Sequence, residues 1–113
     1  MAEACLFCRI ARGEIPAKIV AEDASCIAFR DVNPQAPVHV LVIPRAHVPS
    51  LNEVASPALM TDILQMAREV AKREGIAAGG YRVVFNTNAD GGQSVAHLHA
   101  HVLGGRHMGW PPG

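Results

Sequence analysis

Apolar and polar residues alternate in the segment that carries three of the chain's six histidines. In an extended strand, successive side chains point to opposite faces, so His97, His99 and His101 are expected on one face and the apolar residues between them on the other. A strand that is polar by chance is a weaker explanation, because histidine is a mediocre strand former with little reason to recur. The pattern indicates either a metal site or a cluster of base, nucleophile and hydrogen-bond donor.

Four other segments have the β-branched and apolar composition of strands. A Glu22-Asp23 turn separates the first two, Pro44 stops the third, and an Asp90-Gly91-Gly92 turn leads into the histidine segment. The expected strands are residues 18–21, 25–30, 38–43 and 81–86, followed by the histidine strand that ends at residues 104–105.

Two segments show the spacing of apolar residues that is typical of amphipathic helices. A short N-terminal helix is expected to end at Gly13. The one long helix is expected to start at Ser56-Pro57, with Ser56 as the N-cap, and to close at Gly75. Its buried stripe contains Leu59, Ile63, Ala67, Val70 and Ala71. The pattern predicts an α+β domain over residues 1–113, in which one main helix covers an antiparallel sheet of about five strands.

The composition narrows the classes of partner. Ten basic and ten acidic side chains cancel, so no net charge attracts nucleic acid or an anionic membrane. No apolar run approaches the roughly 20 residues of a membrane helix. The N-terminal residues, Met1 to Cys5, lack the basic segment and apolar core of a signal peptide. We therefore expect a cytoplasmic protein, in which three cysteines do not form a disulfide framework.

Two cysteines are separated by two residues, at Cys5 and Cys8. A redox motif, half of a zinc site and chance all remain open, although the thioredoxin-like setting of a redox motif is absent. Zinc would need two further ligands, for which His39, His47 and one histidine of the triad are candidates. An exposed loop histidine is the simpler explanation of His47, and Cys26 is expected to be a small buried hydrophobe.

The histidine segment also suits phosphoryl chemistry. A neutral imidazole attacks phosphorus when an acceptor holds its far ring nitrogen, which leaves the attacking nitrogen unprotonated. A second imidazole on the same face can donate to a phosphate oxygen or a leaving group. Ser94 and the backbone of residues 91–93 add small donors that approach a phosphate closely. The chain has no P-loop motif, so any nucleotide site is of another type.

The segment His97-Leu98-His99-Ala100-His101-Val102-Leu103 resembles the motif of the histidine triad (HIT) superfamily, in which three histidines alternate with apolar residues. Further segments resemble the Hint branch of that superfamily and together span almost the whole chain. They are residues 13–19, 31–39, 42–47, 90–95 and the terminal Trp110-Pro111-Pro112-Gly113.

The resemblance implies a HIT-like fold, a homodimer whose sheets join, and hydrolysis of purine nucleoside phosphoramidates to AMP without an organic cofactor. It makes His99 the nucleophile that attacks the α-phosphorus. His101 and Ser94 would contact the phosphate and leaving group, and His39 would belong to the same polar network. Hydrolysis of dinucleoside polyphosphates and a nucleotide-binding scaffold role are the alternatives.

The resemblance also implies a nucleotide-binding set. Asp31 would bind the ribose hydroxyls, and Trp110 in the tail of residues 104–113 would reach the partner subunit's site. Gly109 stands where the family often has a histidine before the tryptophan, which bears on leaving-group preference. The base would be enclosed by Phe7, Ile10, Ile15, Phe29 and Val32, and the phosphate side would be lined by Asn86, Gly92 and Gln93.

Some members of the branch bind zinc through Cys-x2-Cys-x38-His-x49-His. In this chain 38 residues separate Cys8 from His47, and 49 separate His47 from His97. The resemblance therefore implies a structural Zn²⁺ held by Cys5, Cys8, His47 and His97. The alternative, one catalytic metal bound by all three triad histidines, lacks a nearby carboxylate to orient the imidazoles.

Overall fold

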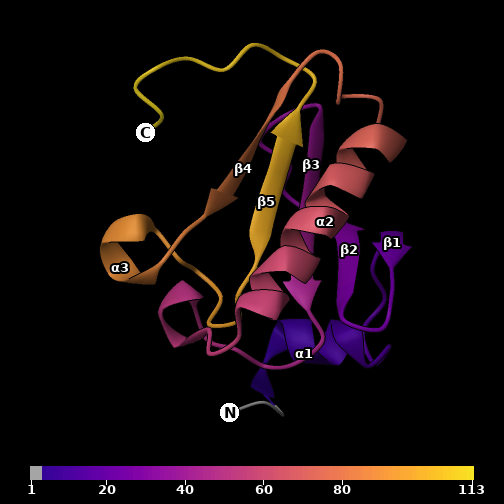
Figure 1. The fold of residues 1–113 in the computed structure, drawn as a ribbon, viewed down its shortest axis with the longest axis vertical. Coiled ribbons are helices and arrows are strands. Elements are labelled where there is room, and N and C mark those ends of the chain that lie inside the picture. The colour runs from indigo at the N-terminus through magenta and orange to yellow at the C-terminus, as the bar shows by residue number, and fades with distance from the viewer. Residues whose placement is uncertain (1–3) are drawn as a thin grey trace.

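Five strands form one antiparallel sheet in the order β1-β2-β3-β5-β4, as the computed structural model shows for residues 4–113 (Figure 1). The predicted α+β class, with one main helix and a short N-terminal helix, is confirmed. Residues 1–3, on which part of the signal-peptide expectation rests, lie outside the described residues. The elements are α1 (Leu6–Ala11), β1 (Ile19–Glu22), β2 (Cys26–Arg30), β3 (Val38–Pro44), a 3-10 turn η2 (Leu51–Glu53), α2 (Pro57–Arg73), β4 (Tyr81–Phe85), α3 (Asn88–Gly91) and β5 (Ala100–Gly104).

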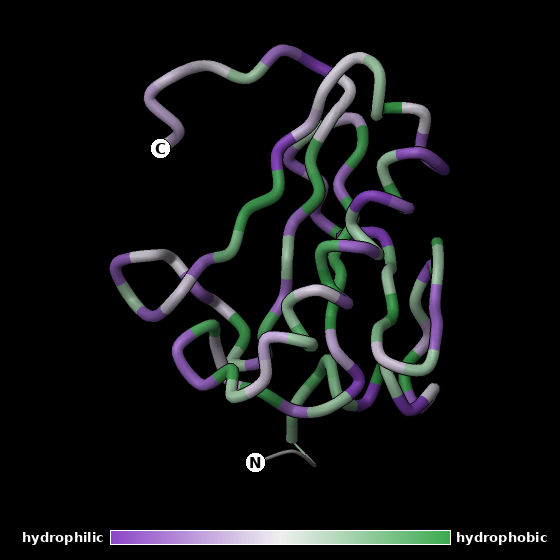
Figure 2. Tube along the Cα trace, viewed as in Figure 1, coloured by the Kyte–Doolittle hydropathy of each residue, from purple (hydrophilic) through white to green (hydrophobic). Residues whose placement is uncertain are grey.

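The sheet has two differently covered faces. In the central strand β3, Val40 and Val42 pack in the core cluster beneath α2, which lies across the sheet in Figure 1. Leu41 and Ile43 point the other way and pack with α1, through Phe7. In Figure 2 the hydrophobic stretches, in green, lie along strands of the sheet, the edge strand β4 included. Because the side chains of β3 and β5 alternate, the face that packs with α1 also carries the catalytic candidates.

The helix α2 begins and ends close to the predicted residues. Pro57 occupies its first turn, whereas the side chain of Ser56 makes no capping hydrogen bond. The chain leaves the helix through Gly75, whose φ of 73° is a left-handed conformation that favours glycine. Ile63, Ala67 and Val70 are buried against the sheet, as the predicted stripe requires. No helix among residues 4–113 combines the length and apolar character needed to cross a bilayer.

The histidine strand is shorter than predicted, because β5 begins only at Ala100. Residues in the segment 97–99 form hydrogen bonds outside the strand ladder. The Leu98 N–H donates to the Val48 carbonyl at 2.6 Å, and the His97 Nε2–H donates to the Pro44 carbonyl at 2.8 Å. The alternation nevertheless persists, since Leu98 and Ala100 lie in the core cluster beneath α2. The histidine side chains are therefore available on the opposite face.

The predicted turn at Asp90-Gly91-Gly92 is the end of a short helix, α3, which the pattern did not predict. Gly92 closes this helix in the left-handed region, with a φ of 78°. The Gln93 side chain braces the segment, since it accepts from the Asn88 N–H at 3.0 Å and donates to the Pro49 carbonyl at 2.7 Å. These contacts set the path by which the chain enters the site.

Candidate active site and metal centre

A cavity of about 870 Å³ lies on the α1 side of the sheet. Its volume falls within the range of sites that enclose a nucleotide-sized ligand. Phe7 and Ile10 from α1 and Phe29 from β2 give it an apolar wall. Its polar groups come from the loop after β2, from β3 and from the histidine segment, as Asp31, His39, Ser94, His99 and His101.

His99 is buried in this cavity, and its ring orientation follows from its hydrogen bond. Its Nδ1 lies 2.7 Å from the carbonyl oxygen of His97. A carbonyl oxygen only accepts, so Nδ1 carries the hydrogen and Nε2 of the neutral ring is unprotonated. Phe7 meets the same ring edge-to-face, with centroids 5.2 Å apart. His99 thus has the tautomer that a nucleophilic imidazole requires.

A chain of hydrogen bonds fixes the tautomers of two further histidines. The Gln35 backbone N–H donates to His39 Nδ1 at 3.0 Å, so the neutral His39 ring carries its hydrogen on Nε2. That Nε2–H donates to His101 Nδ1 at 2.9 Å, with Asp31 Oδ2 also 3.4 Å away. His101 consequently carries its hydrogen on Nε2, a buried atom without a hydrogen-bond partner in residues 4–113.

The charge state of His101 agrees with this series of hydrogen bonds. Burial, with the neighbouring His99 and His39 rings adding to its effect, lowers the pKa of His101 to about 4. Burial also lowers the pKa of His39, although the Asp31 carboxylate opposes it. Both imidazoles are then neutral near pH 7, so the Nε2–H of His101 is a neutral, unsatisfied donor in the cavity wall. A phosphate oxygen or a leaving group would satisfy it.

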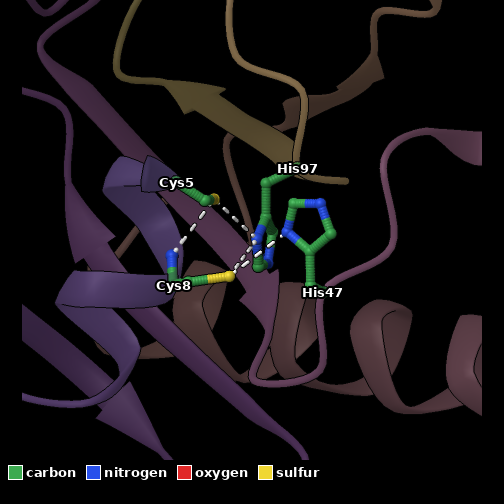
Figure 3. A group of neighbouring side chains, drawn as sticks. All are labelled: Cys5, Cys8, His47 and His97. Atoms are coloured by element: carbon green, nitrogen blue, oxygen red, sulfur yellow. Dashed lines mark hydrogen bonds between the residues drawn. The ribbon is translucent and has the colours of Figure 1, made fainter. Parts of the chain in front are cut away.

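Two cysteines and two histidines meet beside the cavity (Figure 3). Cys5 and Cys8 come from the start of α1, His47 follows β3, and His97 precedes β5. Cys5 Sγ lies 3.3 Å from His97 Nδ1, and Cys8 Sγ lies 3.2 Å from His47 Nδ1 and 3.4 Å from His97 Nδ1. All four donor atoms lie within 4.8 Å of one another.

These separations fit a tetrahedral metal. Zinc–sulfur and zinc–nitrogen bonds of about 2.3 and 2.0 Å place tetrahedral sulfur and nitrogen ligands about 3.5 Å apart. The bond from the His97 Nε2–H to the Pro44 carbonyl leaves Nδ1 unprotonated and directed at the cysteines, which is the usual outer contact of a metal-binding histidine. The Cys8 N–H donates to Cys5 Sγ at 3.3 Å. Two thiolates and two imidazoles suit zinc.

A second group of three, Asp31, His39 and His101, also brings its donor atoms within 4.8 Å. Metal binding at His39 Nε2 would require a hydrogen on Nδ1, where the Gln35 N–H already points. This group is therefore better described as a hydrogen-bonded relay. The three triad imidazoles do not appear together in either of the metal-type groups found among residues 4–113, which disfavours one shared catalytic metal.

Comparison with known proteins shows which family the chain belongs to. The HIT domain model matches residues 12–108. The chain belongs to the HIT family. Purine nucleoside phosphoramidase of Escherichia coli K12 is 46% identical over 111 residues, which cover 96% of this chain and 93% of the relative.

Solved structures of the HIT family agree with the fold. A HIT family hydrolase from Legionella pneumophila is 53% identical and superposes with a TM-score of 0.93, covering 96% of this chain and 99% of the other. A Zn-bound histidine triad family protein from Mycobacterium smegmatis is 27% identical, with a TM-score of 0.84 over 94% of this chain and 78% of the other. The resemblance inferred from the histidine motif is therefore confirmed.

Of the other predicted nucleotide residues of this HIT protein, one lines the cavity and five do not. Val32 lines the cavity rim and is fully exposed. Ile15 does not line the cavity but packs against the apolar cluster that contains Phe7. The structure does not place the remaining four on the cavity wall: Asn86, Gly92, Gln93 and Trp110. Gln93 and Gly92 shape the loop before the triad, and Trp110 is 82% exposed near Arg82.

Sequence reasoning missed several residues of the cavity wall. Leu41 could have been found, because it alternates with His39 on β3 and shares its face. Pro37 and Lys18 belong to segments that were expected only as a loop and a strand, and nothing local shows that they border a cavity. The further missed residues are Leu6, Pro16, Ala17, Arg30, Pro34 and Val95.

Proposed function

We propose that this HIT-family protein hydrolyses purine nucleoside 5′-phosphoramidates to a nucleoside monophosphate and an amine, through a nucleotidyl group on His99. The main observation in support is that His99 and His101 have defined tautomers in one cavity. His99 offers an unprotonated Nε2, and the adjacent His101, with ring centroids 4.9 Å apart, offers an unsatisfied Nε2–H. The 46% identical relative from Escherichia coli is a purine nucleoside phosphoramidase, which supports the substrate class.

The lining of the cavity suggests how such a substrate binds. Phe7 and Phe29 stand in an edge-to-face arrangement with centroids 5.5 Å apart, and an apolar wall of this kind suits a purine ring. Asp31 reaches the cavity from the loop after β2, where its carboxylate can accept from ribose hydroxyls. The phosphate would then lie beside His99, His101 and Ser94. We assign Ile10, Ile15 and Val32 to the base, and Asn86, Gly92 and Gln93 to support of the loop on the phosphate side.

The reaction proceeds in two displacements. His99 Nε2 attacks phosphorus, the phosphorus–nitrogen bond breaks, and the amine leaves with the bonding electrons and takes up a proton from solvent. His101 Nε2–H donates to the phosphate or leaving group, while His39 and its Gln35 contact hold the His101 ring. Water then attacks phosphorus, the phosphorus–Nε2 bond breaks, and the water loses to solvent the proton that balances the one taken up by the amine. This step releases the nucleotide and restores neutral His99.

We assign the Cys5–Cys8–His47–His97 cluster to a structural Zn²⁺, because its four donors leave no open position for substrate. Such an ion stabilises the fold, and no step of the reaction passes through it. Both thiols are free of disulfides, which fits the reducing cytoplasm that we propose as the location.

We propose a homodimer formed at the β4 side of the sheet. β4 is the last strand in the sheet order, and Tyr81 on it and Trp110 beyond it are exposed. A partner would cover this edge and receive Trp110 near its own cavity. Sedimentation of the full chain is expected to give twice the mass of 12.0 kDa, and a monomer at micromolar concentration contradicts the proposal.

The substrate class is tested by comparing two nucleotides. We expect kcat/KM for adenosine 5′-phosphoramidate to exceed that for a diadenosine polyphosphate by at least about 10²-fold, roughly 3 kcal/mol in transition-state binding. Both substrates are assayed with the metal-loaded protein, and AMP release is measured by chromatography. Equal rates contradict phosphoramidate specificity, and binding of AMP without any turnover supports the scaffold alternative.

A further inference from the structure

The ring of Phe7 contacts both His97, a member of the four-donor cluster, and His99, the proposed nucleophile. Phe7 belongs to the first turn of α1, flanked in sequence by Cys5 and Cys8, and its side chain is buried. Its ring meets His99 edge-to-face at 5.2 Å with an interplanar angle of 89°, and meets His97 at 6.0 Å with an angle of 71°. Edge-to-face pairs at such separations prefer a defined mutual orientation, so Phe7 restrains the rotation of the His99 ring.

The other restraint on this ring comes from the same neighbourhood. His99 Nδ1–H donates to the carbonyl of His97 at 2.7 Å, while the His97 ring points into the four-donor cluster. Two groups therefore restrain the His99 ring. One is the carbonyl of His97, a member of the cluster, and the other is the ring of Phe7, which lies between Cys5 and Cys8 in the sequence. Anything that moves the cluster moves both restraints.

The cluster is one of the contacts that position the helix α1. It has six residues, and a helix of that length is not stable in isolation. Phe7, Cys8 and Ile10 are its buried residues, and Cys8 is at the same time one of the four donors. If the donors separate, α1 keeps the apolar contacts of Phe7 and Ile10 and the hydrogen bond from Arg45 Nη1 to the Ala11 carbonyl at 3.2 Å, and Phe7 loses the restraint that the two neighbouring donors supply.

We propose that Phe7 is a positioning residue that couples the Cys5–Cys8–His47–His97 cluster to the orientation of the His99 ring. The role as nucleophile rests on the proposed function, whereas the coupling itself rests on the contacts above. Loading of the cluster with zinc would then order the nucleophile as well as the fold.

The ring contact is tested first with Phe7→Leu, which keeps apolar volume and removes the aromatic edge. In the zinc-loaded full chain we expect the imidazole ¹⁵N and ¹H NMR signals of His99 to shift and broaden, and kcat to fall about 2- to 10-fold, the range of an aromatic pair. Phe29→Leu is the matched control. Phe29 lines the same cavity and touches Phe7, but makes no ring contact with His99 within residues 4–113. It should raise KM and leave the His99 signals in place.

The coupling is tested by removing and restoring Zn²⁺. In the wild-type chain, chelation should move the His99 signals toward those of Phe7→Leu, and added Zn²⁺ should return them. In Phe7→Leu the same treatment should change them much less. If the stripped chain unfolds, exchange of Zn²⁺ for the larger Cd²⁺, a metal that thiolates also bind, provides the same comparison in the folded protein.

Two results overturn the coupling. One is a His99 spectrum that Phe7→Leu leaves unchanged; the other is a metal-dependent shift of equal size in the wild type and in Phe7→Leu. Neither readout requires turnover. A wild-type chain that fails to cleave the phosphoramidate therefore contradicts the proposed function and leaves the test of the coupling intact.

Discussion

Replacement of His99 with alanine is expected to abolish turnover of adenosine 5′-phosphoramidate in a chain that still folds and binds metal. The His99 ring is the only one in the cavity whose hydrogen is held by a carbonyl while its second nitrogen stays unprotonated, within residues 4–113. Removing it removes the covalent route altogether. We expect kcat to fall by at least about 10³-fold, which corresponds to about 4 kcal/mol of transition-state stabilisation.

The nucleotide should still bind to this variant, because the apolar wall and Asp31 remain. The Kd for AMP, measured by calorimetry, is therefore expected to change far less than kcat, and His99→Gly should behave in the same way. His107→Ala is the matched control, since His107 is exposed in the tail and does not line the cavity. Rapid quenching of the wild type should trap one nucleotidyl group on the peptide that carries His99. Full activity of His99→Ala would falsify the mechanism.

Side-chain alternation was the most informative feature of the sequence. It predicted that the triad histidines would share one face and that the apolar residues between them would lie on the other, and the structure buries Leu98, Ala100 and Val102 beneath the main helix. The run of β-branched residues predicted β3. The start of β5 was wrong by several residues. The His97 ring contacts the Pro44 carbonyl and the cysteines, and the Leu98 N–H donates to the Val48 carbonyl. Because of these contacts, the chain does not join the sheet before Ala100.

The parts of the site that local sequence could not predict depend on partners distant in the chain. Gln93 braces its loop through the Pro49 carbonyl, 44 residues away, and α3 forms beside it. The tautomer of His39 is set by the Gln35 N–H, a backbone group that no pattern of side chains reveals. The four donors could be grouped only through the spacing shared with the family, since the cysteine pair alone left several explanations open.

Removal of the metal is expected to be the largest perturbation of stability. The cluster joins the start of α1 to the segments after β3 and before β5. An ion that binds only the folded chain, at 1,000 times its Kd, contributes about 4 kcal/mol to the free energy of unfolding. For a domain of this size the melting temperature should fall by roughly 15–30 °C when a chelator strips the protein.

Cys8→Ser tests the same interaction without a chelator, because Cys8 Sγ lies within 3.4 Å of both histidine ligand atoms. The variant should lose most bound zinc by elemental analysis and melt near the temperature of the stripped wild type, with no further response to chelation. Cys26→Ala is the matched control: Cys26 is buried beneath α2, apart from the cluster, and burial raises the pKa of its thiol to about 12. This control should lose some core packing yet keep one zinc per chain and its sensitivity to chelation.

Removal of the metal also distinguishes the role of His97 from the role of His99. If the ion is structural, stripped protein that remains folded at low temperature should lose only the several-fold rate that the Phe7 contact supplies, not the 10³-fold expected of a catalytic group. His97 would then be a ligand that holds the fold, and His99, two residues later, the group that reacts. A stripped chain that keeps its melting temperature but loses all turnover would instead assign the metal to the chemistry.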